Sequence, residues 1–543
     1  MWGRTWNSGE SAESIAGEFL LEDGERWYVI RHVDRMQPFF VSVISNVDHW
    51  LFVSSTGGLT AGRVSPETAL FPYRPVDRIH DSYLHTGSRT LLRVSPDEGV
   101  PTWEPFNREQ DERYTVTRNL YKNTVGNKLR FEETNHDLGL TFSYTWATSE
   151  RYGFVRHCRL TNRGDRARRI EVLDGLLNIL PAGVPRATQE AASNLVDAYK
   201  WSELDEATGH ALYALYAGIS DRAEPCESLR ANSVFSLGFD RSRVLLSARQ
   251  LGDFREGRAL EHEPHTRGIR GAYLINAVVE LAPGPPVDWK IVADIERSQT
   301  DLVALRRSLA EPARVAAALE ESIAGGTDEL ERLMAGADGF QATAEENVAC
   351  HHYANVLFNV LRGGIFSDHY QVPSSDLLYS LRHFNGGVYR RNREFLEALP
   401  ETLDCRTLLG RVEAHGDPQL ARLCREYLPI TFGRRHGDPS RPWNQFEIRP
   451  KDSAGQRLLS YQGNWRDIFQ NWEALTFSYP EFVENVIAKF VNASTLDGYN
   501  PYRITKQGID WEVEDPEDPW SYIGYWGDHQ IIYLEKLLEL SRR

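Results

Sequence analysis

The sequence contains few of the residues that mark disulfide-rich, zinc-binding or membrane-spanning proteins. It has 5 cysteines in 543 residues, with no Cys-x-x-Cys pair and no spacing typical of zinc sites. No run of about 18 apolar residues occurs, and the N-terminus lacks the basic-then-apolar pattern of a signal segment. We therefore expect reduced thiols, no bound metal, no membrane partner and a cytoplasmic location.

Positive charge is also scarce. Lys and Arg number 61 against 77 Asp and Glu, which gives a net charge of −16 at pH 7. A surplus of negative charge repels the phosphates of nucleic acids and anionic lipids, so neither is expected as a partner. Neutral glycans are compatible with this charge.

The length and the hydrophobic pattern indicate several folded domains. A chain of 543 residues exceeds one ordinary core, and 41% hydrophobic with 11% aromatic residues is typical of globular proteins. Hydrophobic residues recur with period two from residue 26 to about 295, as in LGLTFSYTWAT and VDWKIVADI. From residue 301 the period becomes helical, and Leu302, Leu305 and Leu309 share one stripe.

These patterns predict a multidomain α and β chain. We assign an N-terminal antiparallel β-sandwich to residues 1–298, linker helices to 299–340, and a helical domain to 341–543. The stretch 49–82 is rich in glycine and proline, which favours a long ordered loop. We expect this loop to leave the sandwich and pack towards the helical domain, because its aromatic residues need burial.

Aromatic and acidic residues concentrate near the end of the chain. Six of the 14 tryptophans lie between Trp443 and Trp526, interleaved with Asp and Glu. The C–H faces of a pyranose stack on Trp or Tyr, while carboxylates and amides bind its hydroxyls. This mixture indicates carbohydrate binding.

The segment WRDIFQN shows how such residues could be arranged. On a helix, its spacing places Asp467, Gln470 and Asn471 on one face. The opposite, packed side would hold Ile468, Phe469, Trp472 and Leu475. The same spacing also fits an N-capped helix whose polar edge only meets solvent.

Two segments resemble motifs of glycoside hydrolase family 94, the cellobiose and chitobiose phosphorylases. WRDIFQN resembles the family's Arg-Asp-x-x-Gln-Asp motif, and GYWGDHQIIYL resembles its Gly-Tyr-Ser-Asp-Asp-His-Leu-Trp-Leu motif. Asn471 stands where the family has aspartate, and Trp526-Gly527 replaces Ser-Asp. The Gly-rich aromatic stretch near residue 57 is similar to a segment of the family's N-terminal sandwich.

The resemblance implies a fold, a reaction and a set of contacts. The helical domain would be an (α/α)6 barrel, and the reaction would be inverting phosphorolysis of a β-linked oligosaccharide, with inorganic phosphate as co-substrate and no other cofactor. Family members are commonly dimers, so a homodimer is also implied. The implied substrate-binding residues are Trp465, Arg466, Asp467, Gln470, Asn471, Trp526, Asp528 and His529.

Two further groups are candidates for chemistry. Asp510 and Glu512 flank Trp511, and an apolar ring favours the protonated carboxyl that a general acid needs. A solvated acidic loop or a cation site explains the same residues. The basic loop with Arg434, Arg435 and His436 fits phosphate, since guanidinium forks match phosphate oxygens, but it also fits a solvated, salt-bridged loop.

The end of the chain carries another expectation. In the family, a Gly-Asp-Trp-Asn-Asp segment with the general acid follows the Asp-His motif, whereas this chain stops 14 residues after His529. We expect an open barrel that binds sugar and turns it over slowly. The alternatives are an inverting hydrolase using Asp510 or Glu512, and a glycan-binding protein without activity.

Overall fold

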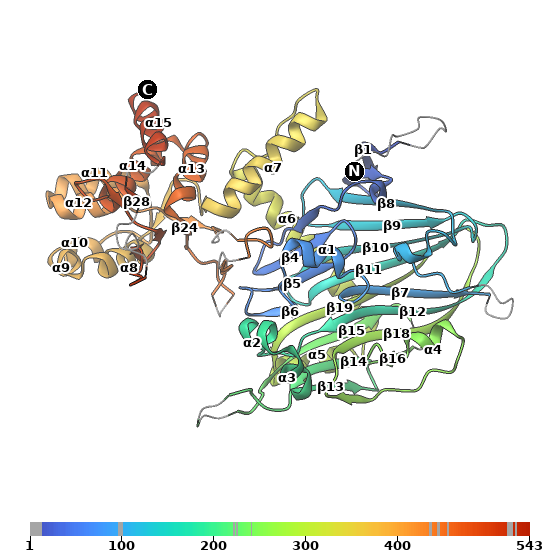
Figure 1. Cartoon of the computed structure of the whole chain (residues 1–543). Helices are drawn as coiled ribbons and strands as arrows, with labels where there is room; N and C mark the ends of the chain where they lie inside the picture. The colour runs from blue at the N-terminus through green and yellow to red at the C-terminus, as the bar shows by residue number, and fades with distance from the viewer. Residues whose placement is uncertain are drawn as a thin grey trace. The chain divides into compact units, whose positions relative to one another are not determined.

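The computed structural model consists of two compact units. Met1–Ser45 with His49–Thr327 forms the first, which we call the β unit, and Asn46–Asp48 with Asp328–Arg543 forms the second, the helical unit. Figure 1 shows the β unit from blue to yellow-green and the helical unit from yellow to red. The structure describes residues 14–95, 101–220, 223, 226–239, 242–433, 437–442, 446–452, 455–517, 525–526 and 529–543.

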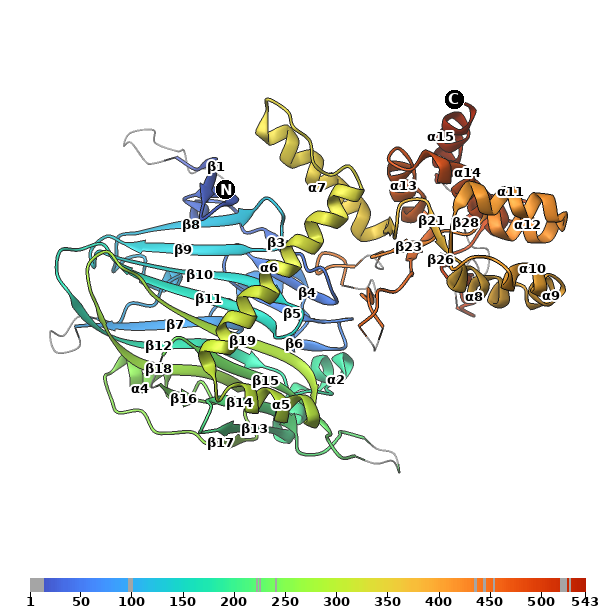
Figure 2. The same cartoon turned by 180° about the vertical axis from the view of Figure 1, so that it is seen from behind.

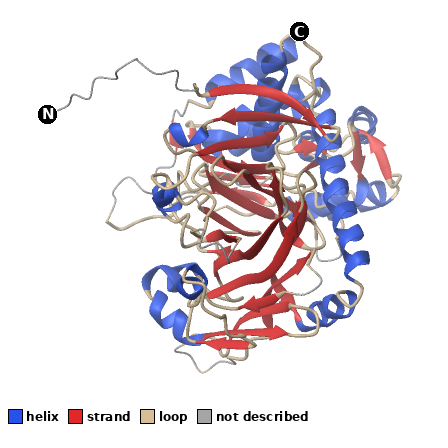
Figure 3. Cartoon of the chain, turned by 90° about the vertical axis from the view of Figure 1, so that its right-hand side faces the viewer, coloured by secondary structure: helices blue, strands red, loops and turns tan. Residues whose placement is uncertain are grey.

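The β unit is built from antiparallel sheets, and strands are its main regular elements (Figure 3). The largest sheet has 11 strands. Their order is β1 (Ala16–Glu22), β2 (Glu25–Arg31), β8 (Val116–Asn123), β9 (Leu129–Asn135), β10 (Leu140–Ser149), β11 (Gly153–Asn162), β19 (Val287–Ser298), β15 (Arg230–Leu237), β14 (His210–Leu215), β13 (Lys200–Asp205) and β17 (His265–Arg267).

Two four-stranded sheets accompany it. One has the order β16 (Arg243–Leu245), β18 (Gly271–Leu281), β12 (Arg168–Ile179) and β7 (Gly87–Val94). The other runs in chain order through β3 (Phe40–Val43), β4 (His49–Ser54), β5 (Leu59–Arg63) and β6 (Ala69–Phe71). Short helices connect the strands: α1 (Val76–Asp81), α2 (Arg186–Ala191), α3 (Ser193–Tyr199) and α4 (Leu251–Arg255).

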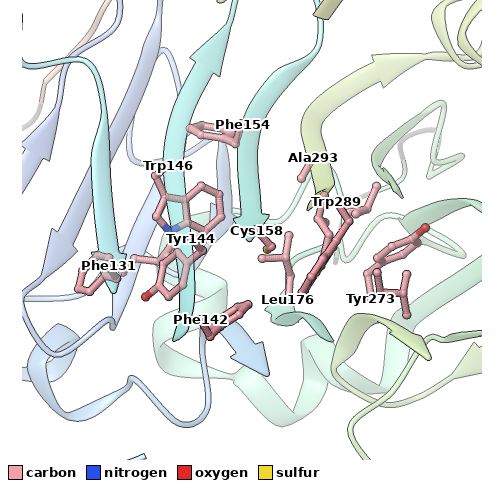
Figure 4. Close-up of a cluster of buried hydrophobic side chains, with 14 of the residues drawn as sticks. Phe131, Phe142, Tyr144, Trp146, Phe154, Cys158, Leu176, Tyr273, Trp289 and Ala293 are labelled. Carbon is pink, nitrogen blue, oxygen red and sulfur yellow. The ribbon is translucent and has the colours of Figure 1, made fainter. Parts of the chain in front are cut away.

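The period-two pattern produces the core between the large sheet and the β16-β18-β12-β7 sheet. Tyr144 on β10 pairs with Cys158 on β11, which pairs with Trp289 on β19, so side chains from three adjacent strands point into one layer. Figure 4 shows these residues together with Leu176 and Tyr273 from the smaller sheet. The antiparallel β architecture predicted for the N-terminal part is therefore confirmed.

A charged group lies at the centre of this apolar layer. Asp174 is 0% exposed and accepts two 2.8 Å hydrogen bonds from Arg156, which is buried with it. Its oxygens also accept from the Thr90 hydroxyl and, at 2.7 Å, from the Trp289 indole. Burial raises the pKa of the Cys158 thiol well above its ordinary value, so the thiol keeps its proton and donates to Asp174. Each of the two Asp174 carboxylate oxygens therefore accepts at least two hydrogen bonds.

The predicted linker helices belong partly to the β unit. α5 (Gln299–Ser308) begins with a capping box formed by Ser298 and Asp301, and α6 (Pro312–Gly336) follows. Leu309, Val315 and Leu319 pack on the outer face of the large sheet, against residues such as Val292. Figure 2 shows both helices over that face. Contacts between residues divide the chain into two units, and the boundary lies between residues 327 and 328, within α6. The expected division had three segments, with boundaries at 298 and 340.

The prediction of a long loop over 49–82 is wrong, because the segment forms β4, β5, β6 and α1. Its glycines serve close approaches: Gly57 has φ +98° in the β4–β5 turn, and a Cβ on Gly58 would lie 2.0 Å from the Ile79 carbonyl oxygen. The aromatic residues of this segment are buried within the β unit. Trp50, for example, contacts Tyr73 at 5.5 Å between ring centroids and donates to the Ser65 carbonyl.

The helical unit contains nine α-helices among its described residues after α6, joined by two- and three-residue strands. None of the described helices is long and apolar enough to cross a lipid bilayer. The helices are α7 (Glu346–Gly363), α8 (Ser374–Phe384), α9 (Gly386–Arg391), α10 (Arg393–Glu397), α11 (Cys405–His415), α12 (Pro418–Arg425), α13 (Trp465–Thr476), α14 (Val483–Ala493) and α15 (Ile531–Arg542).

We predict that Asp174→Asn strongly destabilises the β unit. The substitution leaves Arg156 charged and buried without its counter-ion, which typically costs about 3–5 kcal/mol. Glu190→Gln is the matched control, because Glu190 pairs with Arg186 on an exposed helix and such pairs contribute ~0–1 kcal/mol. Urea unfolding followed by tryptophan fluorescence measures both changes; equal effects would contradict the central role of Asp174.

Candidate functional site

Helix α13 carries the first of the two sequence motifs. Asn464 precedes it, and the predicted packed side of Ile468, Phe469, Trp472 and Leu475 is buried as expected. The indole of Trp472 donates to the Gly363 carbonyl at 2.8 Å, which holds α13 against the end of α7. A Cβ on Gly363 would lie 2.9 Å from the Asn471 Cβ, so this contact requires glycine.

The polar side of α13 differs in part from the prediction. Arg466 and Gln470 are exposed, and Asp467 is half-buried. Asn471 instead points inward, where it is 4% exposed and donates to the Asp467 carbonyl at 2.8 Å. The Asn471 amide therefore makes a hydrogen bond within α13.

Trp465 lies in the core rather than on a binding face. The residue is 0% exposed, and its ring contacts Phe469 and Phe490 with centroids 4.8 and 4.6 Å away. A sugar has no accessible face of this ring to stack on. The expectation that Trp465 binds substrate is corrected accordingly.

The second motif meets the first at the start of α13. The side chain of Gln530, which is fully buried, donates to the Arg466 carbonyl, and His529 lies 3.0 Å from the same amide nitrogen. His529 is itself exposed. Strand β28 (Tyr525–Trp526) pairs with β25 (Tyr499–Asn500), which fixes the backbone at the start of the motif. Asp528 and the side chain of Trp526 lie outside the described residues.

Two residues of α7 extend this polar surface, and the sequence analysis missed both. The Arg362 guanidinium lies 3.8 Å from the centroid of the Phe358 ring, which is 50% exposed. Burial lowers the pKa of Arg362, while the nearby Asp467 carboxylate acts in the opposite direction. The signal in the sequence was the Phe-x-x-x-Arg spacing, which places the two side chains one turn apart.

The basic loop approaches the same place. Arg434, Arg435 and His436 lie outside the described residues, but Asp438 and Arg441 from the same loop act electrostatically on Arg362. The described part of the loop is therefore near Arg362, and through it near Asp467.

The acidic candidates lie on a different element. β24 (Gln462–Asn464), β26 (Arg503–Thr505) and β27 (Gly508–Asp510) form a small sheet, in which Asp510 is paired with Arg503 and forms an ion pair with it. Glu512 is exposed, and Trp511 is 42% exposed. Their catalytic assignment stays a prediction.

A buried ionic cluster in the helical unit also escaped the sequence analysis. Lys506, 5% exposed, pairs with Asp376, which also accepts from the Tyr427 hydroxyl. Burial lowers the pKa of Lys506, and Asp376 opposes that shift. A cavity of about 530 Å³ borders this pair, lined in part by Tyr379 and Arg457. The cluster joins α8 to the turn after β26, and the two are distant in sequence. No group of three or more His, Cys, Asp or Glu side chains in the described part of the chain could hold a metal ion.

One family profile matches part of the helical unit. Residues 366–429 match glycoside hydrolase family 149 insertion domain 1. The match begins at the last residue of β20 (Ile365–Phe366), ends four residues after α12, and includes neither sequence motif. Membership of family 94 is not confirmed, and the profile suggests family 149 for this segment instead. No protein of curated function matches the chain.

Solved structures with some similarity include several that act on carbohydrates by name. A bacterial glucoamylase complexed with acarbose is 9% identical, with TM-score 0.36, over 85% of this chain and 60% of that chain. A human-microbiome protein assigned as a kojibiose phosphorylase is 7% identical, with TM-score 0.28, over 84% and 50%. The family GH92 α-mannosidase from Bacteroides thetaiotaomicron is 11% identical, with TM-score 0.24, over 64% and 39%. This chain thus spans 60% or less of these three chains.

We predict that Gln530→Leu loosens the junction between the two motifs. The substitution removes a buried hydrogen bond to the Arg466 carbonyl, a loss of about 1–3 kcal/mol, and should speed amide exchange over residues 464–470. Gln470→Leu makes the same chemical change at an exposed position of α13 and should stay within about 0.5 kcal/mol. Unchanged exchange in Gln530→Leu would show that the bond does not hold the junction.

Proposed function

We propose that this chain is a carbohydrate-active protein of the glycoside phosphorylase type. In this proposal it binds a β-linked oligosaccharide and transfers a glycosyl group to inorganic phosphate. The helical unit then corresponds to part of an (α/α)6 barrel, and the protein works in the cytoplasm as a homodimer.

The meeting of the two motifs at α13 is the observation that carries the proposal. Gln530 fastens the second motif to the Arg466 carbonyl, so Arg466, Asp467 and His529 share one neighbourhood although they are far apart in the chain. Guanidinium, carboxylate and imidazole groups offer both donors and acceptors to sugar hydroxyls. The exposed Phe358 ring beside Arg362 adds an apolar face of the kind that stacks on pyranoses.

The family 149 profile supports the choice of carbohydrate chemistry. It matches 366–429, a segment that contributes Asp376 and Tyr427 to the buried cluster with Lys506. The segment is thereby joined to the same helical unit that carries α13.

Inorganic phosphate would bind near Arg362. Arg362 is half-buried, and Arg441 in the basic loop acts on it electrostatically. Arg434, Arg435 and His436 belong to that loop and could complete an anion site, because guanidinium forks match phosphate oxygens.

Turnover of β-linked oligosaccharides with and without phosphate tests the reaction type. Phosphate-dependent release of a sugar 1-phosphate supports phosphorolysis. Release of free sugar that ignores phosphate indicates the hydrolase alternative, and saturable binding without turnover indicates a glycan-binding protein.

We predict that Asp467→Asn weakens oligosaccharide binding by about 10- to 100-fold. A hydrogen bond from a sugar hydroxyl to a carboxylate is worth ~1.5–3 kcal/mol, most of which the neutral amide loses. Glu397→Gln is the matched control, because it makes the same carboxylate-to-amide change at an exposed position of α10 rather than on α13. Isothermal titration measures both affinities. Equal affinities in wild type and Asp467→Asn would remove α13 from the binding site.

We predict that Asp510→Asn and Glu512→Gln each change turnover by less than about tenfold. Asp510 is held by Arg503, and Glu512 is exposed beyond the end of β27. Loss of a true general acid typically lowers the rate by ~10²–10⁴. Steady-state rates decide: a loss of that size in either variant would establish the carboxyl as the acid.

A further inference from the structure

A second, smaller cavity of about 20 Å³ lies inside the helical unit. Its walls come from the segment 366–429 on one side and from residues after 460 on the other. Space of this size is enough for at least one water-sized occupant. The lining residues are Leu377, Ser380, Leu381, Phe384, Leu423, Glu426, Tyr427, Leu428, Tyr461, Lys489 and Lys506.

Two buried ammonium groups line this cavity, and among the described residues only one of them has a carboxylate partner. Lys506 pairs with Asp376. Lys489, on α14, is also 5% exposed, but no carboxylate of the described chain lies within 4.0 Å of it. Its ammonium lies 4.9 Å from the centroid of the Phe384 ring and next to the Tyr461 hydroxyl, where it opposes the rise in the pKa of Tyr461 caused by burial. A buried charge without a counter-ion is unfavourable.

The other polar groups at the cavity do not supply the missing acceptor. Glu426 accepts from the Asn492 amide at 2.7 Å and has Arg422 at 4.0 Å. Asp376 is occupied by Lys506 and by the Tyr427 hydroxyl. Ser380 is 7% exposed, and its hydroxyl has no hydrogen-bond partner among the described residues. Among these groups, the Ser380 hydroxyl therefore has no acceptor, and the Lys489 ammonium has no carboxylate partner.

We propose that this cavity binds a small monovalent anion, such as chloride, between Lys489, Lys506 and the Ser380 hydroxyl. The anion supplies a counter-charge for Lys489 and accepts the hydrogen bond that Ser380 makes to no described residue. Ser380 belongs to α8 in the 366–429 segment, whereas Lys489 belongs to α14. The bound anion thus links the 366–429 segment to the rest of the helical unit. This role does not depend on any reaction at α13.

Thermal unfolding of the full chain tests the site. At equal ionic strength, sodium chloride or bromide should raise Tm above its value in sodium gluconate by about 2–4 °C, because an anion that binds only the folded state stabilises it. Lys489→Met should abolish the difference, and the milder Ser380→Ala should reduce it. Lys536→Met is the matched control, since Lys536 lies 5.2 Å from the Tyr533 ring on exposed α15 and should keep the difference.

Crystals of the full chain grown in bromide give a second measurement that does not depend on a variant. An anomalous difference peak beside Lys489 Nζ and Ser380 Oγ is expected. The proposal would be overturned if the Tm of the wild type did not depend on chloride. It would also be overturned if the cavity contained only water in crystals grown in bromide. An equal loss of the Tm difference in Lys536→Met would likewise overturn it, because the effect would then not arise from this cavity.

Discussion

The close contact between α13 and α7 determines where the candidate site can form. Gly363 has no Cβ, so Asn471 and Trp472 reach the α7 backbone, and the Trp472 indole bonds to the Gly363 carbonyl. The contact leaves the other side of α13 turned away from the core. Asp467 then comes within electrostatic range of Arg362, one residue before the glycine. A Cβ at position 363 would lie 2.9 Å from the Asn471 Cβ, so the two helices could not keep this close contact.

Both units contain charge inside an apolar surrounding, but they satisfy it differently. In the β unit, Asp174 collects donors from Arg156, Thr90 and Trp289, all within one sandwich. In the helical unit, Asp376 forms an ion pair with Lys506 and accepts a hydrogen bond from the Tyr427 hydroxyl. These two partners come from separate parts of the chain. The first arrangement specifies the register between sheets, and the second joins the family 149-like segment to its surroundings.

Local periodicity was enough to predict the regular parts of the fold. The alternation through Tyr144 and Trp289 predicted inward-facing strands, and the spacing of Ile468 and Trp472 predicted the buried side of α13, because both depend on near neighbours in the chain. The segment 49–82 was misjudged because its glycines allow close packing as well as turns.

The site could be predicted only in part. The sequence placed Asp467 on a helix, but it could not show that Asn471 turns inward, because that depends on where α7 lies. The same holds for the contact of Lys489 with Phe384 and for that of Asp376 with Lys506, because each joins residues more than 100 positions apart. The spacing of residues along one helix or strand does not predict contacts between residues that are far apart in the sequence.

The burial of the cysteines has a practical consequence for chemical labelling. Burial raises the pKa of Cys405 and Cys424 to about 12, and that of Cys158 well above its ordinary value, so none of the three presents a reactive thiolate near neutral pH. Cys226 is exposed. A maleimide should therefore label the folded protein at Cys226 first. Slower labelling of Cys158 would report opening of the β unit, and labelling of Cys405 or Cys424 would report opening of the helical unit, so each unit contains its own reporter of local unfolding.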